Sequence, residues 1–173
     1  NGGPGCSSMS GFLDEIGPAT FPEGETELKM NEYSWNKLAN MVFLESPGNV
    51  GFSKIDSELE EELYIDDDIT AQENFEAMMN FFTKFPKYKT NDFYISGESY
   101  AGIYIPMLAK KFLDYNKGVP DSQKIRLKGF LIGNGVATYE IDGAVSLMDF
   151  AFSHHLIDYD TRRRYNKVCV TEY

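Results

Sequence analysis

The chain has 173 residues, of which 42% are hydrophobic, so it can bury a sizeable core, and its length favours a single domain. Its net charge of −11 at pH 7 and its sequence pI of about 4.6 argue against nucleic acid and an anionic membrane surface as partners. Acidic residues gather in segment 56–68, where we expect a solvated loop that leads into a helix. A calcium site is the weaker interpretation, because these carboxylates do not follow a recognised loop spacing.

Residues 1–8 form a glycine-rich segment that lacks the lysine and the spacing of a phosphate-binding P-loop. Glycine lets a chain bring exposed backbone N–H groups close to a substrate oxygen, and this is the use that we favour. Residues 9–18 follow as a predicted short helix that ends at Gly17 and Pro18, a usual stop signal.

Residues 41–44 are a continuous apolar run, which predicts a strand in the buried middle of a parallel sheet. Residues 45–53 then form a loop at the carboxyl end of this strand, where open α/β sheets gather their sites.

The clearest predicted helix begins at Asp66 or Asp67 and ends before Pro86. Along it, apolar residues recur at intervals of three and four: Phe75, Met78, Phe82 and Phe85. We interpret this stripe as core. A short linker leads to a predicted strand over residues 92–95, in the order strand, helix, strand of a parallel crossover.

Ser99 lies where this strand turns into a predicted helix over residues 103–112. The surrounding sequence GESYA fits the G-x-S-x-G pattern, with Ala101 in place of the second glycine. In that pattern the serine occupies a strained corner, and its Oγ stands clear of the backbone. The spacing alone leaves both a nucleophilic serine and a structural turn open.

Beyond residues 115–120, which break the pattern, residues 124–132 predict a further strand. It ends in a loop at residues 133–135, on the same sheet edge as Ser99. Residues 149–156 and 160–168 predict helices, and the arginines at 162–164 favour a solvated basic patch on the second one.

Four segments, in order, resemble the signatures of the serine carboxypeptidases. They are NGGPGCSS at residues 1–8, ESPGNVGFS at 45–53, GESYAGIYIP at 97–106 and IGNG at 132–135. The resemblance implies an α/β-hydrolase fold, with a mostly parallel central sheet and helices on both faces. It further implies that residues 1–173 are part of that domain, truncated at both ends, and that the family's inserted helical region begins near residues 150–173.

The resemblance also assigns roles to residues around the turn. Ser99 is then the nucleophile, and the backbone N–H groups of Gly3 and Tyr100 form the oxyanion hole. The Asn1 side chain and the Gly2 N–H hold the terminal carboxylate of a peptide. Asn49 and Lys54 depart from the residues that are frequent in the family, which could alter the rim of the cleft.

By the same resemblance Glu15 pairs with Glu98 beside the carboxylate site. Two carboxyl groups in contact cannot both ionise cheaply, so they share a proton. A protonated pair can donate a hydrogen bond to a substrate carboxylate, whereas an ionised pair would repel it. We therefore expect peptide binding to weaken as pH rises.

The implied activity is release of C-terminal residues from peptides or proteins through an acyl-enzyme, with no metal or organic cofactor. An activated serine needs a base, and the family places its triad Asp and His beyond position 173. His154 and His155 are the only histidines and the weaker candidates for this base. Two alternatives stay open: acyl transfer to an acceptor other than water, and a catalytically silent fragment or binding module.

Cys6 and Cys169 are the only cysteines, too few for a disulfide scaffold and wrongly arranged for a zinc site. They could pair with each other, while the resemblance implies partners further along a longer chain. It also implies an oxidising compartment, which is the vacuole, the lysosome or the outside of the cell. The sequence does not specify an oligomeric state.

Overall fold

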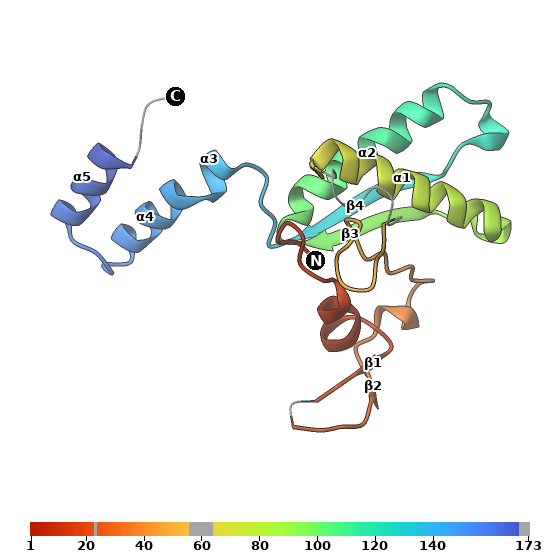
Figure 1. Cartoon of the computed structure of the whole chain (residues 1–173), viewed down its shortest axis with the longest axis horizontal. Coiled ribbons are helices and arrows are strands. Elements are labelled where there is room, and N and C mark those ends of the chain that lie inside the picture. The colour runs from red at the N-terminus through yellow and green to blue at the C-terminus, as the bar shows by residue number, and fades with distance from the viewer. Residues whose placement is uncertain (23, 56–63, 170–173) are drawn as a thin grey trace. The chain divides into compact units, whose positions relative to one another are not determined.

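The computed structural model describes residues 1–22, 24–55 and 64–169 of the chain (Figure 1). The backbone divides into two compact units, Asn1–Gly135 and Val136–Tyr173. The acidic stretch 56–63, on which most of the calcium alternative rests, lies outside the described residues.

The first unit contains short elements before its two long helices. In chain order they are the π-helical turn η1 (Gly11–Glu15), strands β1 (Ala19–Thr20) and β2 (Lys29–Met30), and the 3-10 turn η2 (Trp35–Lys37). The long part follows as α1 (Asp67–Lys84), η4 (Pro86–Tyr88), β3 (Phe93–Glu98), α2 (Ala101–Lys117), η5 (Asp121–Gln123) and β4 (Leu127–Gly133).

The predicted helix that ends before Pro86 is confirmed as α1. Asp66 caps it, since its carboxylate accepts a hydrogen bond from the Ile69 N–H at 2.8 Å. Pro86 follows at the start of η4, where its missing N–H is not needed.

Strands β3 and β4 pair in parallel and are joined by α2, which forms a parallel crossover. The crossover that the sequence predicts, from residues 41–44 through α1 to β3, is wrong, because residues 41–44 form no strand. The register pairs Ile95 with Phe130 and Glu98 with Gly133. Both strands therefore end at the same edge of the sheet. The turn after β3 and the loop at residues 133–135 start from that edge, as the sequence predicts.

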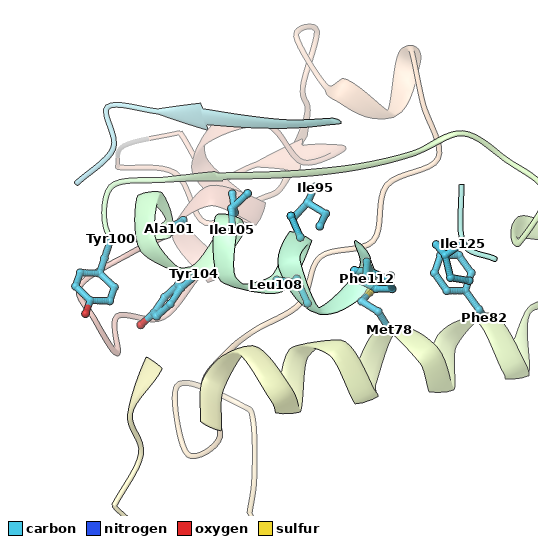
Figure 2. Packing of buried hydrophobic residues seen from close by; sticks show 11 residues of the cluster. Met78, Phe82, Ile95, Tyr100, Ala101, Tyr104, Ile105, Leu108, Phe112 and Ile125 are labelled. Carbon is cyan, nitrogen blue, oxygen red and sulfur yellow. The ribbon is translucent and has the colours of Figure 1, made fainter. Parts of the chain in front are cut away.

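The core lies where α2 packs between the sheet and α1 (Figure 2). Phe112 of α2 is completely buried, and its ring meets those of Phe75 and Phe93 edge-on at centroid distances of 5.0 and 5.3 Å. The Phe82 ring of α1 meets the ring of Phe93 at 5.4 Å. Both helices thus lie on the same face of the sheet. The expected fold has helices on both faces, and neither α1 nor α2 supplies the layer on the opposite face.

The prediction of a buried strand over residues 41–44 is wrong. The structure gives this run no strand, and Val42, Phe43 and Leu44 are 36–45% exposed. A strand needs a neighbour with which to exchange backbone hydrogen bonds. Among the described residues, β3 pairs only with β4 and not with this run. The helix predicted over residues 9–18 is present in shorter form, with η1 at its centre.

The second unit consists of α3 (Tyr139–Asp142), α4 (Ala144–Ser153) and α5 (Tyr159–Val168). Both predicted helices exist, although α4 begins five residues before the expected position 149. Arg162 is not simply solvated, because its guanidinium bonds Asp149 of α4 at 2.6 Å and lies 4.6 Å over the ring of Phe152. This arginine therefore ties α5 to α4.

Candidate active site

Ser99 occupies the sharp turn between β3 and α2, as the sequence predicts. Its φ of 61° lies in the left-handed region, which costs a non-glycine residue about 1–2 kcal/mol. Two backbone hydrogen bonds hold the turn. The Ser99 N–H donates to the Gly133 carbonyl at 3.0 Å, and the Gly102 N–H donates to the Ser99 carbonyl at 2.9 Å. The strained backbone is the geometry that presents a serine hydroxyl above a sheet edge.

The glycine-rich segment passes directly against this turn at Gly2. A Cβ at Gly2 would lie 2.8 Å from the Ser99 Cβ and 2.9 Å from its Oγ, and it would overlap the Tyr100 nitrogen. Only glycine allows this approach. The Gly2 carbonyl accepts a hydrogen bond from the Cys6 N–H at 3.1 Å, and Gly3 lies inside this tight turn with φ 119°.

Asn1 and Glu98, which are 97 positions apart in the chain, are brought into direct contact. The Asn1 Nδ2 donates to the Glu98 Oε2 at 2.9 Å. The Asn1 Oδ1 accepts a hydrogen bond from the Gly11 N–H at 3.1 Å, so the amide is fixed from both sides. Because Glu98 directly precedes Ser99, this pair lies next to the candidate nucleophile.

Glu15 ends η1 and is exposed. Its backbone carbonyl accepts a hydrogen bond from the Asn31 Nδ2 at 2.8 Å, which fixes the main chain at this position. Among the described contacts, the Glu98 carboxylate is engaged by Asn1. The pairing of Glu15 with Glu98 stays a prediction.

Glu45 joins the glycine-rich segment to the loop at residues 45–53, a contact that sequence reasoning missed. Its carboxylate accepts a hydrogen bond from the Ser7 hydroxyl and another from the Phe52 N–H at 2.8 Å. The bond from Ser7, followed by that from Phe52, lowers the pKa of Glu45. In the same loop, the Asn49 Oδ1 accepts from the Ile55 N–H at 3.1 Å. This departure from the family pattern therefore supports the loop itself.

A cavity of about 960 Å³ runs beside β3, between this strand and the segment that contains residues 39–46. Asn1 and Trp35 line it, together with Ile95 and Leu131. Ser99, Gly3 and Glu98 do not line it. We therefore place the candidate site at the turn rather than in this larger space.

The profile of the serine carboxypeptidase family matches residues 1–173. The chain belongs to the serine carboxypeptidase family. Serine carboxypeptidase-like 35 of Arabidopsis thaliana is 43% identical over 173 residues, which cover 99% of this chain and 36% of that protein. Serine carboxypeptidase-like 26 of Oryza sativa subsp. japonica is 42% identical over 172 residues, which cover 98% and 35%.

Among solved structures, the chain is similar to Kex1(delta)p, a prohormone-processing carboxypeptidase from Saccharomyces cerevisiae. The TM-score is 0.81 at 32% identity, and the match covers 99% of this chain and 39% of that one. This similarity confirms the expected fold class, and the parallel pair with its helices is part of an α/β-hydrolase domain. The chain spans little more than a third of the length of these three proteins.

The two histidines of this chain, His154 and His155, lie in the second unit. The His154 Nδ1 is 2.9 Å from the Phe150 carbonyl, and the imidazole stacks on the Phe150 ring at 3.9 Å. This nitrogen is therefore engaged within its own helix end. Cys6 and Cys169 are both free and exposed. In the part of the chain that the structure describes, no group of three His, Cys, Asp or Glu residues could hold a metal ion, and no helix is both long and apolar enough to cross a bilayer.

Proposed function

We propose that the full-length protein is a serine-type carboxypeptidase, which hydrolyses the last peptide bond of a peptide through an acyl-enzyme on Ser99. The observation that carries this proposal is the contact between Asn1 and Glu98 immediately beside the Ser99 turn. The Asn1 side-chain amide, held in place by the Glu98 carboxyl group, can hydrogen-bond the carboxylate of a substrate. A free carboxylate is the group that distinguishes the C-terminal end of a peptide from its middle.

The position of the pair supports cleavage close to the free end of a peptide. Glu98 directly precedes Ser99, and its carboxylate accepts a hydrogen bond from the Asn1 side chain. Gly2, which follows Asn1, packs against the Ser99 side chain. A substrate carboxylate held by Asn1 and Glu98 would therefore lie beside the serine that attacks.

In the proposed reaction, the Ser99 Oγ attacks the carbonyl carbon of the last peptide bond while a base takes its proton. The negative oxygen that forms is stabilised by the N–H groups of Gly3 and Tyr100. The C–N bond then breaks, and the leaving amino acid takes a proton on its nitrogen. Water attacks the resulting ester in the same way and releases the shortened peptide.

Asn1, Gly2, Glu15 and Glu98 bind the substrate carboxylate in this proposal. The Asp and His that would activate Ser99 are placed outside this chain, as the family resemblance implies. The substrates are then peptides or proteins with a free C-terminal carboxylate.

The test uses the full-length gene product and two peptides of one sequence, one with a free C-terminal acid and one with a C-terminal amide. We expect hydrolysis of the acid and a loss of about tenfold or more in kcat/KM on the amide. Asn1→Ala should raise KM for the acid by about tenfold and leave the amide unaffected, because it removes a hydrogen bond to a charged group. Asn80→Ala, on the exposed side of α1, is the matched control.

Equal cleavage of acid and amide by the wild type would contradict a carboxypeptidase. Product analysis in the presence of alcohols or amines separates hydrolysis from acyl transfer, since an ester or amide product would favour the transferase. Failure of a fluorophosphonate to label Ser99 in the full-length protein would favour a binding module instead.

We further propose an oxidising compartment, either vacuolar, lysosomal or extracellular, for the full-length protein. The free and exposed thiols of Cys6 and Cys169 are then available for disulfides with other parts of the protein. Mass spectrometry of the non-reduced protein would identify these disulfides. Two free thiols in protein isolated from its native source would contradict the proposal.

A further inference from the structure

Two tyrosines at the start of α2, Tyr100 at its N-cap and Tyr104 in its first turn, connect the candidate oxyanion hole to other parts of the fold. The Tyr100 hydroxyl lies 3.1 and 3.0 Å from the two carboxylate oxygens of Asp67, in the first turn of α1. The Tyr104 hydroxyl accepts a hydrogen bond from the Gly5 N–H at 3.2 Å. The two rings meet edge-on at 5.0 Å, and Figure 2 shows their hydroxyl oxygens pointing away from the sheet.

Both tyrosines are buried, with 7% of Tyr100 and 9% of Tyr104 exposed. A hydrogen bond from a buried phenol to a carboxylate is stronger than one between neutral groups, and it has one defined geometry. Asp67 is half-buried beside it. The side chain of Tyr100 is thus fixed at its far end by α1, while its backbone forms the start of α2.

The backbone of Tyr100 is also the part of this residue that the proposed chemistry uses. Its N–H is one of the two proposed oxyanion donors, and it follows Ser99, whose φ of 61° is strained. A strained turn relaxes unless its neighbours hold it. Tyr100 is such a neighbour. Gly2, which precedes the other proposed donor Gly3, packs against the backbone nitrogen of Tyr100.

We propose that Asp67 is a positioning residue for the oxyanion hole, because its carboxylate holds the Tyr100 phenol and thereby fixes the Tyr100 N–H. Asp67 itself does not touch the substrate. This inference rests on the proposed function, since it needs an oxyanion that forms at Ser99. Tyr104 acts in parallel on the other wall, where its hydroxyl holds Gly5 of the glycine-rich segment.

The test compares Asp67→Ala and Tyr100→Phe in the full-length protein, singly and together, with Asp68→Ala as the matched control. Asp68 is the next residue of α1 and is exposed. Each test variant should lower kcat about tenfold and change KM by no more than about twofold. The Tyr100 N–H stabilises the negative oxygen that develops in the transition state, so its displacement affects the chemical step more than substrate binding. The double variant should lose no more than either single one, since both remove the same contact. Asp67→Asn, which keeps an acceptor oxygen, should retain most of the activity.

A second measurement separates positioning from a general loss of structure. A peptide aldehyde forms a tetrahedral adduct with a serine, and its affinity should fall about tenfold in Asp67→Ala. The affinity for the free amino acid product, which places no oxygen in the hole, should stay the same. Tyr100→Phe removes a single oxygen atom. Its affinity for the aldehyde tests the same contact if Asp67→Ala does not fold.

The outcomes are distinguishable. If the wild type is active and Asp67→Ala and Tyr100→Phe match Asp68→Ala in kcat and aldehyde affinity, the positioning role is overturned and the proposed function stands. A loss of thermal stability alone also overturns it. If the wild type neither cleaves peptides nor reacts with a fluorophosphonate at Ser99, the proposed function fails, and the positioning role fails with it.

Discussion

The core and the candidate site meet at the same turn, but they are built in opposite ways. The core is filled with large rings, and Phe112 has no exposed surface between Phe75 and Phe93. At the site, atoms are left out, since the missing side chain of Gly2 is what lets the first segment touch Ser99. Removing atoms should therefore damage the core, and adding them should damage the site.

The sharpest test of this contrast adds one methyl group to the site. Gly2→Ala should lower the rate at which a fluorophosphonate labels Ser99 in the full-length protein by about a thousandfold, as loss of an oxyanion donor does. The physical reason is that the new Cβ would lie within 3 Å of the Ser99 Oγ and displace the segment. Labelling is read by mass spectrometry of the modified peptide.

Gly118→Ala is the control for this substitution. Gly118 follows α2 with a φ of −91°, and a Cβ there would meet only the Tyr115 carbonyl, at an ordinary 3.6 Å. It should label like the wild type. Normal labelling of Gly2→Ala would show that the segment does not press on the turn.

The complementary test removes atoms from the core. Phe112→Ala should lower the free energy of unfolding by about 3–5 kcal/mol, because the cavity cannot close between two aromatic neighbours. Leu113→Ala, at the next position and 51% exposed, should cost far less. Chemical denaturation of both variants measures the difference. Equal losses would contradict the assignment of Phe112 to the core.

A smaller effect tests the carboxylate side of the site. Glu98→Ala removes the acceptor of the Asn1 Nδ2 hydrogen bond, so KM for peptides with a free C-terminus should rise about tenfold in the full-length protein. Glu76→Ala, at an exposed position of α1, should keep the KM of the wild type. Equal KM values for Glu98→Ala and the wild type would contradict a carboxylate site at this pair.

The smallest effect concerns the hydrogen bond between Glu45 and Ser7 of the glycine-rich segment. The pKa of Glu45 is lowered in the folded protein, mainly by the Ser7 hydroxyl. Its contribution to stability is therefore present above the ordinary pKa of 4.5 and is lost as pH falls through the lowered folded value. Glu45→Gln should melt slightly below the wild type at pH 7, and this difference in melting temperature should close as pH falls below 4.5. A difference in melting temperature that widens in acid would contradict this contribution of Glu45.

Local patterns in the sequence predicted most of the fold that surrounds the site. The helix after Asp66, the strand before Ser99 and the later strand β4 depend on residues close in the chain, whose spacing is visible in the sequence. The run at residues 41–44 shows where this fails. An apolar run of strand length indicates a strand, but only a paired neighbour makes it one.

The contacts that fix the site were predicted less completely. The resemblance placed Asn1 and Glu98 on one site, and their hydrogen bond fits that assignment. The contact between Tyr100 and Asp67 was not foreseen. These residues are 33 positions apart, and neither has a local pattern that marks it. Such pairs depend on how α1 packs on α2, which the spacing within either helix does not specify.

The crossing of β3 and α2 has room for one methyl group. A Cβ at Gly97 would lie 2.6 Å from the Cβ of Ala101 and 2.9 Å from the Cδ1 of Ile105. Ala101 can therefore replace the second glycine of the motif because the first position, Gly97, has no side chain. A genetic selection for revertants of Gly97→Ala should accordingly return Ala101→Gly, because the pair can exchange its methyl group but cannot carry two.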